Sequence, residues 1–221
     1  MRESVLQHRS KDMELSSLSI ALNIIRRKMG SVDWRLAYII ARCIHSVGDP
    51  LIIKHLRFSP NITSIIEGAC KSIRRVVVDV EMAYSGIASR CRALGIETEV
   101  AIRHARRKDM RVADGLEKLV DEGLIDECTV LVNGNAPSFL EVAINAILSG
   151  KARPLLIIAT PPGFVKAPSV KARLLSLNTP YMTTIGSRGG SPIASAMFNA
   201  VVDVCTGRAW EALQHLGYVH C

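Results

Sequence analysis

Three short apolar runs between residues 129 and 184 dominate the pattern of hydrophobic and polar positions along the chain. They begin at Thr129, Pro154 and Tyr181. Each is rich in β-branched residues, ends at glycine, proline or asparagine, and precedes a helical pattern. Continuous apolar runs of this length are typical of strands buried on both faces in a parallel sheet. Residues 129–202 therefore predict three successive strand–loop–helix units.

Two more units of the same kind come before these three. Strands are predicted at 75–80 and 98–102, with helices at 81–93 and 109–122. Five strands joined by helical crossovers predict an α/β fold, a doubly wound, mostly parallel five-stranded sheet of the Rossmann-like class. Loops at the carboxyl ends of such strands gather at one edge, which is where open α/β sheets bind ligands.

The first seventy residues predict a helical N-terminal layer. Helices are expected from residue 12 to Gly30, from Asp33 to about residue 48, and over 51–56. A fourth, ending near residue 71, is expected to begin at Ser59-Pro60, as an N-cap followed by proline in the first turn. Residues 1–10 are expected to fray, and the segment 207–221 to be peripheral.

Composition narrows the class of protein. The 221 residues are 48% hydrophobic and 22% charged, which favours one globular α/β domain over residues 1–221. No apolar run approaches the ~18–20 residues of a membrane helix, and the N-terminus lacks the apolar core of a signal peptide. A cytoplasmic protein without a membrane partner is therefore expected. The six cysteines form no C-x-x-C pair, so most are predicted to be small, reduced, buried residues rather than zinc ligands or disulfides.

A net charge of +8 indicates an anionic partner. Nucleic acid, a membrane surface and a polyanionic small molecule would all satisfy it. The aromatic content is only 5%, with no basic–aromatic interleaving, which disfavours a stacking platform for single-stranded nucleic acid.

Glycine-rich loops supply the first candidate site. Gly186-Ser-Arg-Gly-Gly-Ser191 lies between a predicted strand and a helix, where free N–H groups and the helix N-terminus attract anions. It matches neither common nucleotide-binding glycine motif, and a tight turn needing positive φ is the alternative. Arg188 within it favours an anion site. Loops 134–137 and 162–165 line the same edge, so a pocket is predicted there.

Two basic features are the second set of candidates. His45 lies in the last turn of a predicted helix, where the helix C-terminus stabilises an imidazolium and makes proton donation reasonable. A purely structural histidine is the alternative. The segment 103–111 carries five positive charges after the second predicted strand. It is either a solvated loop or a clamp for carboxylates.

Six blocks, in this order, resemble one known family. They are Cys43-Ile-His-Ser-Val-Gly-Asp49, Leu56-Arg-Phe-Ser-Pro60, Asp79-Val-Glu-Met-Ala-Tyr-Ser-Gly86, Gly134-Asn-Ala-Pro137, Gly163-Phe-Val165 and Gly186-Ser-Arg-Gly-Gly-Ser191. From about Ser19 to Ala200 the chain is similar to the precorrin-8X methylmutase family of corrin biosynthesis. It departs from the family pattern at Ala88, where a hydroxyl is usual, and at Ser138, where threonine is usual.

The resemblance implies an isomerase that moves a methyl group from carbon 11 to carbon 12 of precorrin-8 or cobalt-precorrin-8, giving hydrogenobyrinate or cobyrinate. It implies no dissociable cofactor and no protein-bound metal. It also implies His45 as the catalytic proton donor, and a homodimer with its active site at or near the subunit interface. The substrate-binding residues implied are Ser19, Arg111, Gly134, Asn135, Ala136, Gly163, Phe164, Arg188, Gly189, Gly190 and Ser191.

The expected partner is thus a tetrapyrrole polycarboxylate rather than nucleic acid or a membrane. A basic protein with arginine-bearing and N–H-rich loops suits a flat apolar ring with carboxylate arms. The rival is a basic α/β nucleotide- or nucleic-acid-binding module, which predicts steeply salt-dependent binding to generic DNA or RNA. A corrinoid-binding protein without turnover is a third reading, which His45 disfavours. Whether the substrate carries cobalt stays open.

Overall fold

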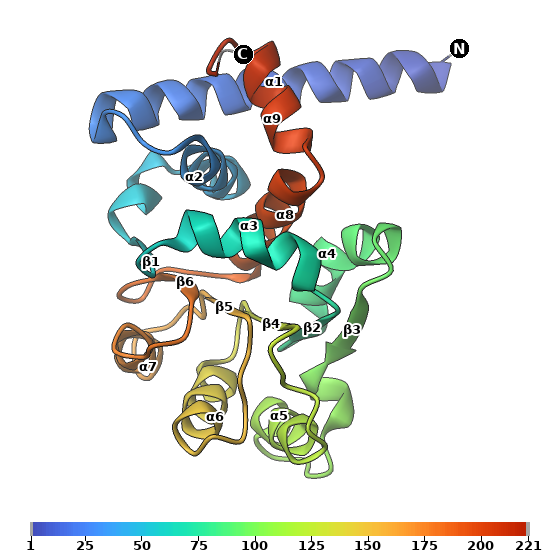
Figure 1. The fold of residues 1–221 in the computed structure, drawn as a ribbon, viewed down its shortest axis with the longest axis vertical. Helices are drawn as coiled ribbons and strands as arrows, with labels where there is room; N and C mark the ends of the chain where they lie inside the picture. Colours follow the sequence, from blue (N-terminus) through green and yellow to red (C-terminus); the bar gives the residue numbers. More distant parts are fainter. Residues whose placement is uncertain (1, 220–221) are drawn as a thin grey trace.

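A computed structural model describes residues 2–219 and contains a six-stranded sheet between two layers of helices (Figure 1). The strand order is β1-β6-β5-β4-β2-β3, and every pairing is parallel except that of β1 with β6. The strands are β1 (Leu56–Phe58), β2 (Arg75–Val78), β3 (Glu97–Val100), β4 (Thr129–Asn133), β5 (Leu156–Ala159) and β6 (Tyr181–Thr184). The five predicted parallel strands are confirmed, and the predicted mixed α/β class with them.

The edge strand β1 is missing from the prediction, and the short helix expected over 51–56 is found only in part, as a 3-10 helix that ends before Leu56. Pro50–Lys54 form a short 3-10 helix, η1, and Leu56–Phe58 then pair antiparallel with β6. Three residues are too few to show the alternation that marks a strand. The predicted cap at Ser59 is also wrong: its hydroxyl accepts a 3.1 Å hydrogen bond from the backbone of Tyr181, and α3 follows Asn61 instead.

Helices cover both faces of the sheet (Figure 1). Helices α5, α6 and α7 pack on one face, around a core that includes Leu131, Phe139 and Ile157. The other face carries the larger core, which the N-terminal and C-terminal helices share with α4 and α8. The helices are α1 (Arg2–Met29), α2 (Trp34–Val47), α3 (Ile62–Ser72), α4 (Glu81–Ala93), α5 (Arg111–Asp121), α6 (Pro137–Leu148), α7 (Ala167–Leu174), α8 (Ser191–Cys205) and α9 (Arg208–His215), with a second 3-10 helix, η2 (Ala101–His104).

Both ends of the chain are more regular than expected. α1 begins at Arg2, not near residue 12, and crosses over α2 as one long helix (Figure 1). α9 buries Ala209 and Leu213 in the larger core, and the ring of Trp210 lies edge-on to Trp34 at 5.2 Å. The C-terminal segment as far as α9 is therefore part of the packed layer that holds α1 and α2.

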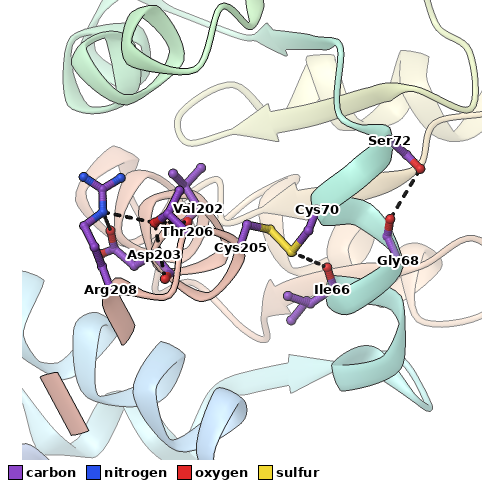
Figure 2. The surroundings of a disulfide bond; sticks show 9 residues. All are labelled: Ile66, Gly68, Cys70, Ser72, Val202, Asp203, Cys205, Thr206 and Arg208. Carbon is purple, nitrogen blue, oxygen red and sulfur yellow. Dashed lines mark hydrogen bonds and ion pairs between the residues drawn. A yellow bond between two sulfur atoms is a disulfide. The ribbon is translucent and has the colours of Figure 1, made fainter. Parts of the chain in front are cut away.

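A disulfide joins Cys70, near the end of α3, to Cys205, at the end of α8 (Figure 2). The expectation of reduced cysteines is therefore wrong for this pair, although Cys43 and Cys91 are free and buried as predicted. The two bonded residues are 135 apart in sequence, so no local spacing signals the bond. Only the packing of α3 beside α8 brings them together.

No helix within residues 2–219 is long and apolar enough to cross a bilayer. No group of three or more histidine, cysteine, aspartate or glutamate side chains in that range is arranged to hold a metal ion.

Candidate functional site

His45 lies exposed in the last turn of α2, between the C-terminal cap of this helix and a serine of α1. The helix ends at Gly48, whose left-handed backbone (φ 64°) closes the last turn by donating to the carbonyl of Ile44. The Ser17 hydroxyl of α1 lies 2.7 Å from Nδ1 of the imidazole. No described residue bonds Nε2. The ring is thus held at one nitrogen and open at the other.

The imidazole borders a groove of about 540 Å³ between α1 and α2. Its lining is mainly apolar, with Ile20, Ala21, Ile24 and Ile44 beside the histidine. Grooves of this size, apolar with few polar groups, are typical of small-molecule sites. The remaining lining residues are Asp12, Met13, Ser16, Ser17, Gly48 and Pro50.

A polar seam fixes α1 over this face of α2. Tyr38, Arg42 and His45 follow a spacing of four and three residues, which places them on one helix face. Arg42 pairs with Glu14 of α1, and the Tyr38 hydroxyl donates to buried Asp203 of α8 at 3.1 Å. Burial, followed by the charge of Asp203, raises the pKa of Tyr38, which therefore remains a hydroxyl donor. The Arg42–Glu14 pair thus joins this face of α2 to α1 close to His45, and the Tyr38–Asp203 bond joins the same face to α8.

Ser19, the serine implied by the resemblance, is not brought to His45. It is two residues from Ser17, which is about 200° around a helix. It lines a separate small cleft with Asn23, Arg26 and Tyr218. Ser17 is the N-terminal serine that contacts the histidine, and the helical spacing of α1 against α2 is the only sequence signal that could have identified it.

At the carboxyl edge of the sheet, the loop after β4 is folded around a carboxylate of the chain itself. Asp79 follows β2, and strand order reverses between β2 and β4. Its side chain accepts hydrogen bonds from the backbone N–H groups of Gly134, Asn135 and Ala136 at 3.2, 2.6 and 2.8 Å. Burial raises the pKa of Asp79, and these donors oppose that rise. The N–H groups of this loop are therefore occupied.

The glycine loop after β6 is a tight turn that also carries a charged side chain. Gly186 and Gly190 have φ of 69° and 130°, as the turn reading predicts. A Cβ on Gly189 would lie 2.1 Å from the carbonyl oxygen of Thr160, so only glycine permits this approach to the loop after β5. Arg188 pairs with Asp49 at 2.5 Å, which ties the loop to the segment that follows His45.

The loop after β5 presents an apolar tip. Gly163 has φ of 131° and donates its N–H to the carbonyl of Ser187 in the neighbouring glycine loop. The next two side chains, Phe164 and Val165, are 89% and 91% exposed. An exposed phenylalanine on an ordered turn is a surface that an apolar ligand or another protein face would cover.

Most of the basic segment 103–111 is neutralised within the protein. Arg103 pairs with Glu81, and Arg106 and Arg107 pair with buried Asp114. Hydrogen bonds from the backbone of Arg107 and Arg106 and from the Arg107 side chain lower the pKa of Asp114 to about 2. Among the described residues, the cations left without an ion pair in this segment are Lys108 and Arg111.

Arg111 and His45 are not brought together within one chain. Arg111 opens α5 after β3, at one end of the sheet. The His45 segment is tied through Asp49 and Arg188 to the loop after β6. Three strands separate β3 from β6, a distance of roughly 19 Å at the usual strand spacing.

Residues 17–204 match the precorrin-8X methylmutase family. The chain belongs to this family. A cobalt-precorrin-8 methylmutase of Methanocaldococcus jannaschii is 32% identical over 171 residues, which cover 74% of this chain and 77% of that protein. A precorrin-8X methylmutase of Pseudomonas aeruginosa is 30% identical over 175 residues, covering 75% and 83%.

The fold agrees with the family assignment. The crystal structure of the precorrin-8X methylmutase from Thermus thermophilus superposes with a TM-score of 0.74 at 26% identity, covering 86% of this chain and 96% of that one. The family relationship makes this methylmutase an isomerase of cobalamin biosynthesis. The groove beside His45 and the loops at the carboxyl edge are the two candidate regions for its active site.

Proposed function

We propose that this methylmutase moves a methyl group from carbon 11 to carbon 12 of precorrin-8 or cobalt-precorrin-8, with His45 as the proton donor. The observation that carries the proposal is the setting of His45. Its ring borders an apolar groove, its Nδ1 is engaged by Ser17, and its Nε2 is open to a ligand. When Ser17 donates to Nδ1, the neutral imidazole carries its proton on Nε2. In the imidazolium both nitrogens carry protons, and Nδ1–H donates to the Ser17 hydroxyl instead.

The chemistry needs little else from the protein. The bond from the methyl group to carbon 11 breaks, a bond to carbon 12 forms, and carbon 11 becomes trigonal, so the product, hydrogenobyrinate or cobyrinate, is an isomer of the substrate. A proton lent by Nε2 to a nearby ring nitrogen draws electron density from the migrating centre and is returned afterwards. General acid catalysis of this kind is typically worth ~10²–10⁴-fold. The apolar groove orients the ring.

Two kinds of group bind the carboxylate arms and the ring in this proposal. Arg111 clamps a carboxylate, because it is a cation of the basic segment without an internal partner. The carboxyl-edge loops form the wall of the site, and Phe164 offers an exposed ring for apolar contact. Gly134–Ala136 contribute only to the shape of this wall, because Asp79 occupies their N–H groups. The assigned loop residues are Gly134, Asn135, Ala136, Gly163, Phe164, Arg188, Gly189, Gly190 and Ser191, with Ser19 as a further contact from α1.

A homodimer completes the proposed site. One chain separates His45 from Arg111 by three strands, so a two-fold pair in which the Arg111 edge of one copy faces the groove of the other brings both to one substrate. Exposed apolar side chains at the groove and at the tip after β5 supply contact area; they are Met13, Ile20, Phe164 and Val165. Light scattering should give twice the 24.1 kDa chain mass, and a monomer at micromolar concentration would contradict this arrangement.

The direct test of the activity is incubation of the purified protein with precorrin-8 and, separately, with cobalt-precorrin-8. Trigonal carbon 11 lengthens the conjugated path, so conversion should shift the absorption to the red. The faster of the two reactions identifies the natural substrate. An unchanged spectrum in both, together with salt-dependent binding of generic DNA, would support the nucleic-acid-binding alternative.

A further inference from the structure

Lys171 of α7 is fully buried beneath the glycine loop 186–190. Its Nζ donates to Thr184 Oγ1 at 3.1 Å and to the carbonyl of Arg188 at 2.8 Å. Neither acceptor is charged, and no described carboxylate pairs with this ammonium. Burial lowers the pKa of Lys171 to about 8. Removing an unpaired ammonium from water is costly, and a perturbed lysine at a ligand-binding edge is a candidate for a functional role.

The contacts of Lys171 act on one point of the loop. Thr184 Oγ1 also donates to the carbonyl of Arg188, at 2.8 Å, so that oxygen accepts from two groups on the buried side. Gly190 is fixed separately, because its N–H donates to the carbonyl of Thr160 at 2.7 Å. The backbone of Arg188 is thus held from below, while its guanidinium reaches Asp49 on the exposed side.

Asp49 connects this loop to the segment that follows α2, the helix that carries His45. It lies four residues after His45, and its carboxylate also accepts from the backbone N–H of Leu51 at 2.8 Å, which starts η1. The Leu51 N–H and then Arg188 lower the pKa of Asp49, so it is a carboxylate at neutral pH. A continuous set of polar contacts therefore runs from Lys171 of α7, through Arg188, to Asp49 just after α2.

We propose that Lys171 is a positioning residue, which fixes the backbone of Arg188 from beneath so that the loop 186–190 presents its guanidinium beside the His45 groove. Asp49 engages only one nitrogen of the half-exposed guanidinium, so a carboxylate arm of the substrate can meet the remaining donors of an arginine already held in place. The substrate-binding half of this inference rests on the proposed function, whereas the fixing of the loop does not. The alternative is a lysine that is merely tolerated in the core.

Lys171→Met separates the two readings, because it keeps the length of the side chain and removes the donor. Hydrogen–deuterium exchange is measured on peptides covering 185–191, and activity is measured with precorrin-8. We expect exchange there to rise roughly tenfold, since the loss of a typical hydrogen bond is worth about one decade. KM should rise by roughly the same factor, with kcat little changed. Lys151→Met, which removes an exposed lysine after α6, should alter neither.

A merely tolerated lysine gives the opposite result. Replacing a buried charge by an apolar side chain of similar volume is then neutral or stabilising, with normal exchange in 185–191 and normal KM. That outcome would overturn the proposal. If the wild-type protein does not convert the substrate, the binding half fails with the proposed function, and the exchange data still decide the loop half.

Thr184 provides a second pair of variants in case Lys171→Met does not fold. Thr184→Val keeps the shape and removes the hydroxyl, whereas Thr184→Ser keeps the hydroxyl. The proposal expects faster exchange in 185–191 for the valine variant and rescue by serine. Equal exchange in the two variants would contradict it.

Discussion

Ser17 of α1 and His45 of α2 meet through a hydrogen bond of 2.7 Å between the hydroxyl and Nδ1. The two residues come from consecutive helices, which are joined by the Arg42–Glu14 ion pair and by the buried apolar residues Leu18 and Leu22 of α1. This hydrogen bond holds the orientation of the imidazole ring, while Nε2 has no hydrogen bond to any described residue. Ser17 is therefore the residue that orients the proposed proton donor, His45.

Ser17→Ala should lower kcat roughly tenfold, with less effect on KM, because the ring loses the partner of Nδ1 and the orientation that it confers. Nitrogen-15 shifts of His45 should show a larger fraction of the wrong tautomer. Ser19→Ala is the matched variant, since the family resemblance favours Ser19 and the geometry favours Ser17. A larger loss of kcat from Ser19→Ala would reverse that ranking.

Arg111→Ala should weaken binding of hydrogenobyrinate by about 1.5–3 kcal/mol, the usual value of a charge-assisted hydrogen bond. The measurement is an absorbance titration at fixed ionic strength. Arg107→Ala is the control from the same segment. Its guanidinium is already engaged by Asp114 and Glu117, so it should change stability more than affinity. Equal affinities for both variants would remove the clamp assignment.

Asp114 should make stability sensitive to acid. Its folded pKa is held at about 2, below the ordinary value of 3.8, so the unfolded chain binds the proton more tightly. The stabilisation is therefore present above pH 3.8 and is lost as the pH falls through about 2. Urea unfolding of wild type and Asp114→Asn between pH 6 and 2 should converge in acid. A constant difference across this range would contradict the assignment.

The Cys70–Cys205 bond should stabilise the fold through its long closed loop. Its loss should cost roughly 2–4 kcal/mol, or a fall of roughly 5–15 °C in Tm for a chain of this size. Adding a dithiol reductant should produce this fall, and the denatured protein should titrate two more thiols after reduction than before. The double variant Cys70→Ser/Cys205→Ser should have a Tm that does not respond to reductant.

The sequence predicts the parallel sheet well because its strands are continuous apolar runs between clear breakers. It misses β1 because a three-residue edge strand has no period, and it misses the disulfide because the partners are 135 residues apart. The site divides in the same way. His45 is identifiable from its place at a helix end and from the family blocks. Ser17 and Lys171 carry no motif, and their contacts exist only because α1 lies on α2 and α7 lies under the glycine loop.

The sequence also does not determine which positive charges remain free to bind a ligand. Five cations in 103–111 read as a uniform patch, but internal carboxylates neutralise Arg103, Arg106 and Arg107. The loop 134–137 is predicted only to line a pocket, and the structure shows that Asp79 occupies the N–H groups of Gly134–Ala136. Which groups remain for a ligand is decided by tertiary pairing, so the count of basic residues overstates the binding surface.

The central claim is that His45 acts in turnover rather than in binding, and a single-turnover assay on His45→Ala tests it most directly. Each enzyme, variant or wild type, is mixed in excess with precorrin-8 or cobalt-precorrin-8, whichever the wild type converts faster. Absorbance is then followed with time. His45→Ala is expected to retain the macrocycle through gel filtration. Its red shift in absorbance should develop at least about 10²-fold more slowly than that of wild type. Conversion by His45→Ala at a near wild-type rate would contradict the account.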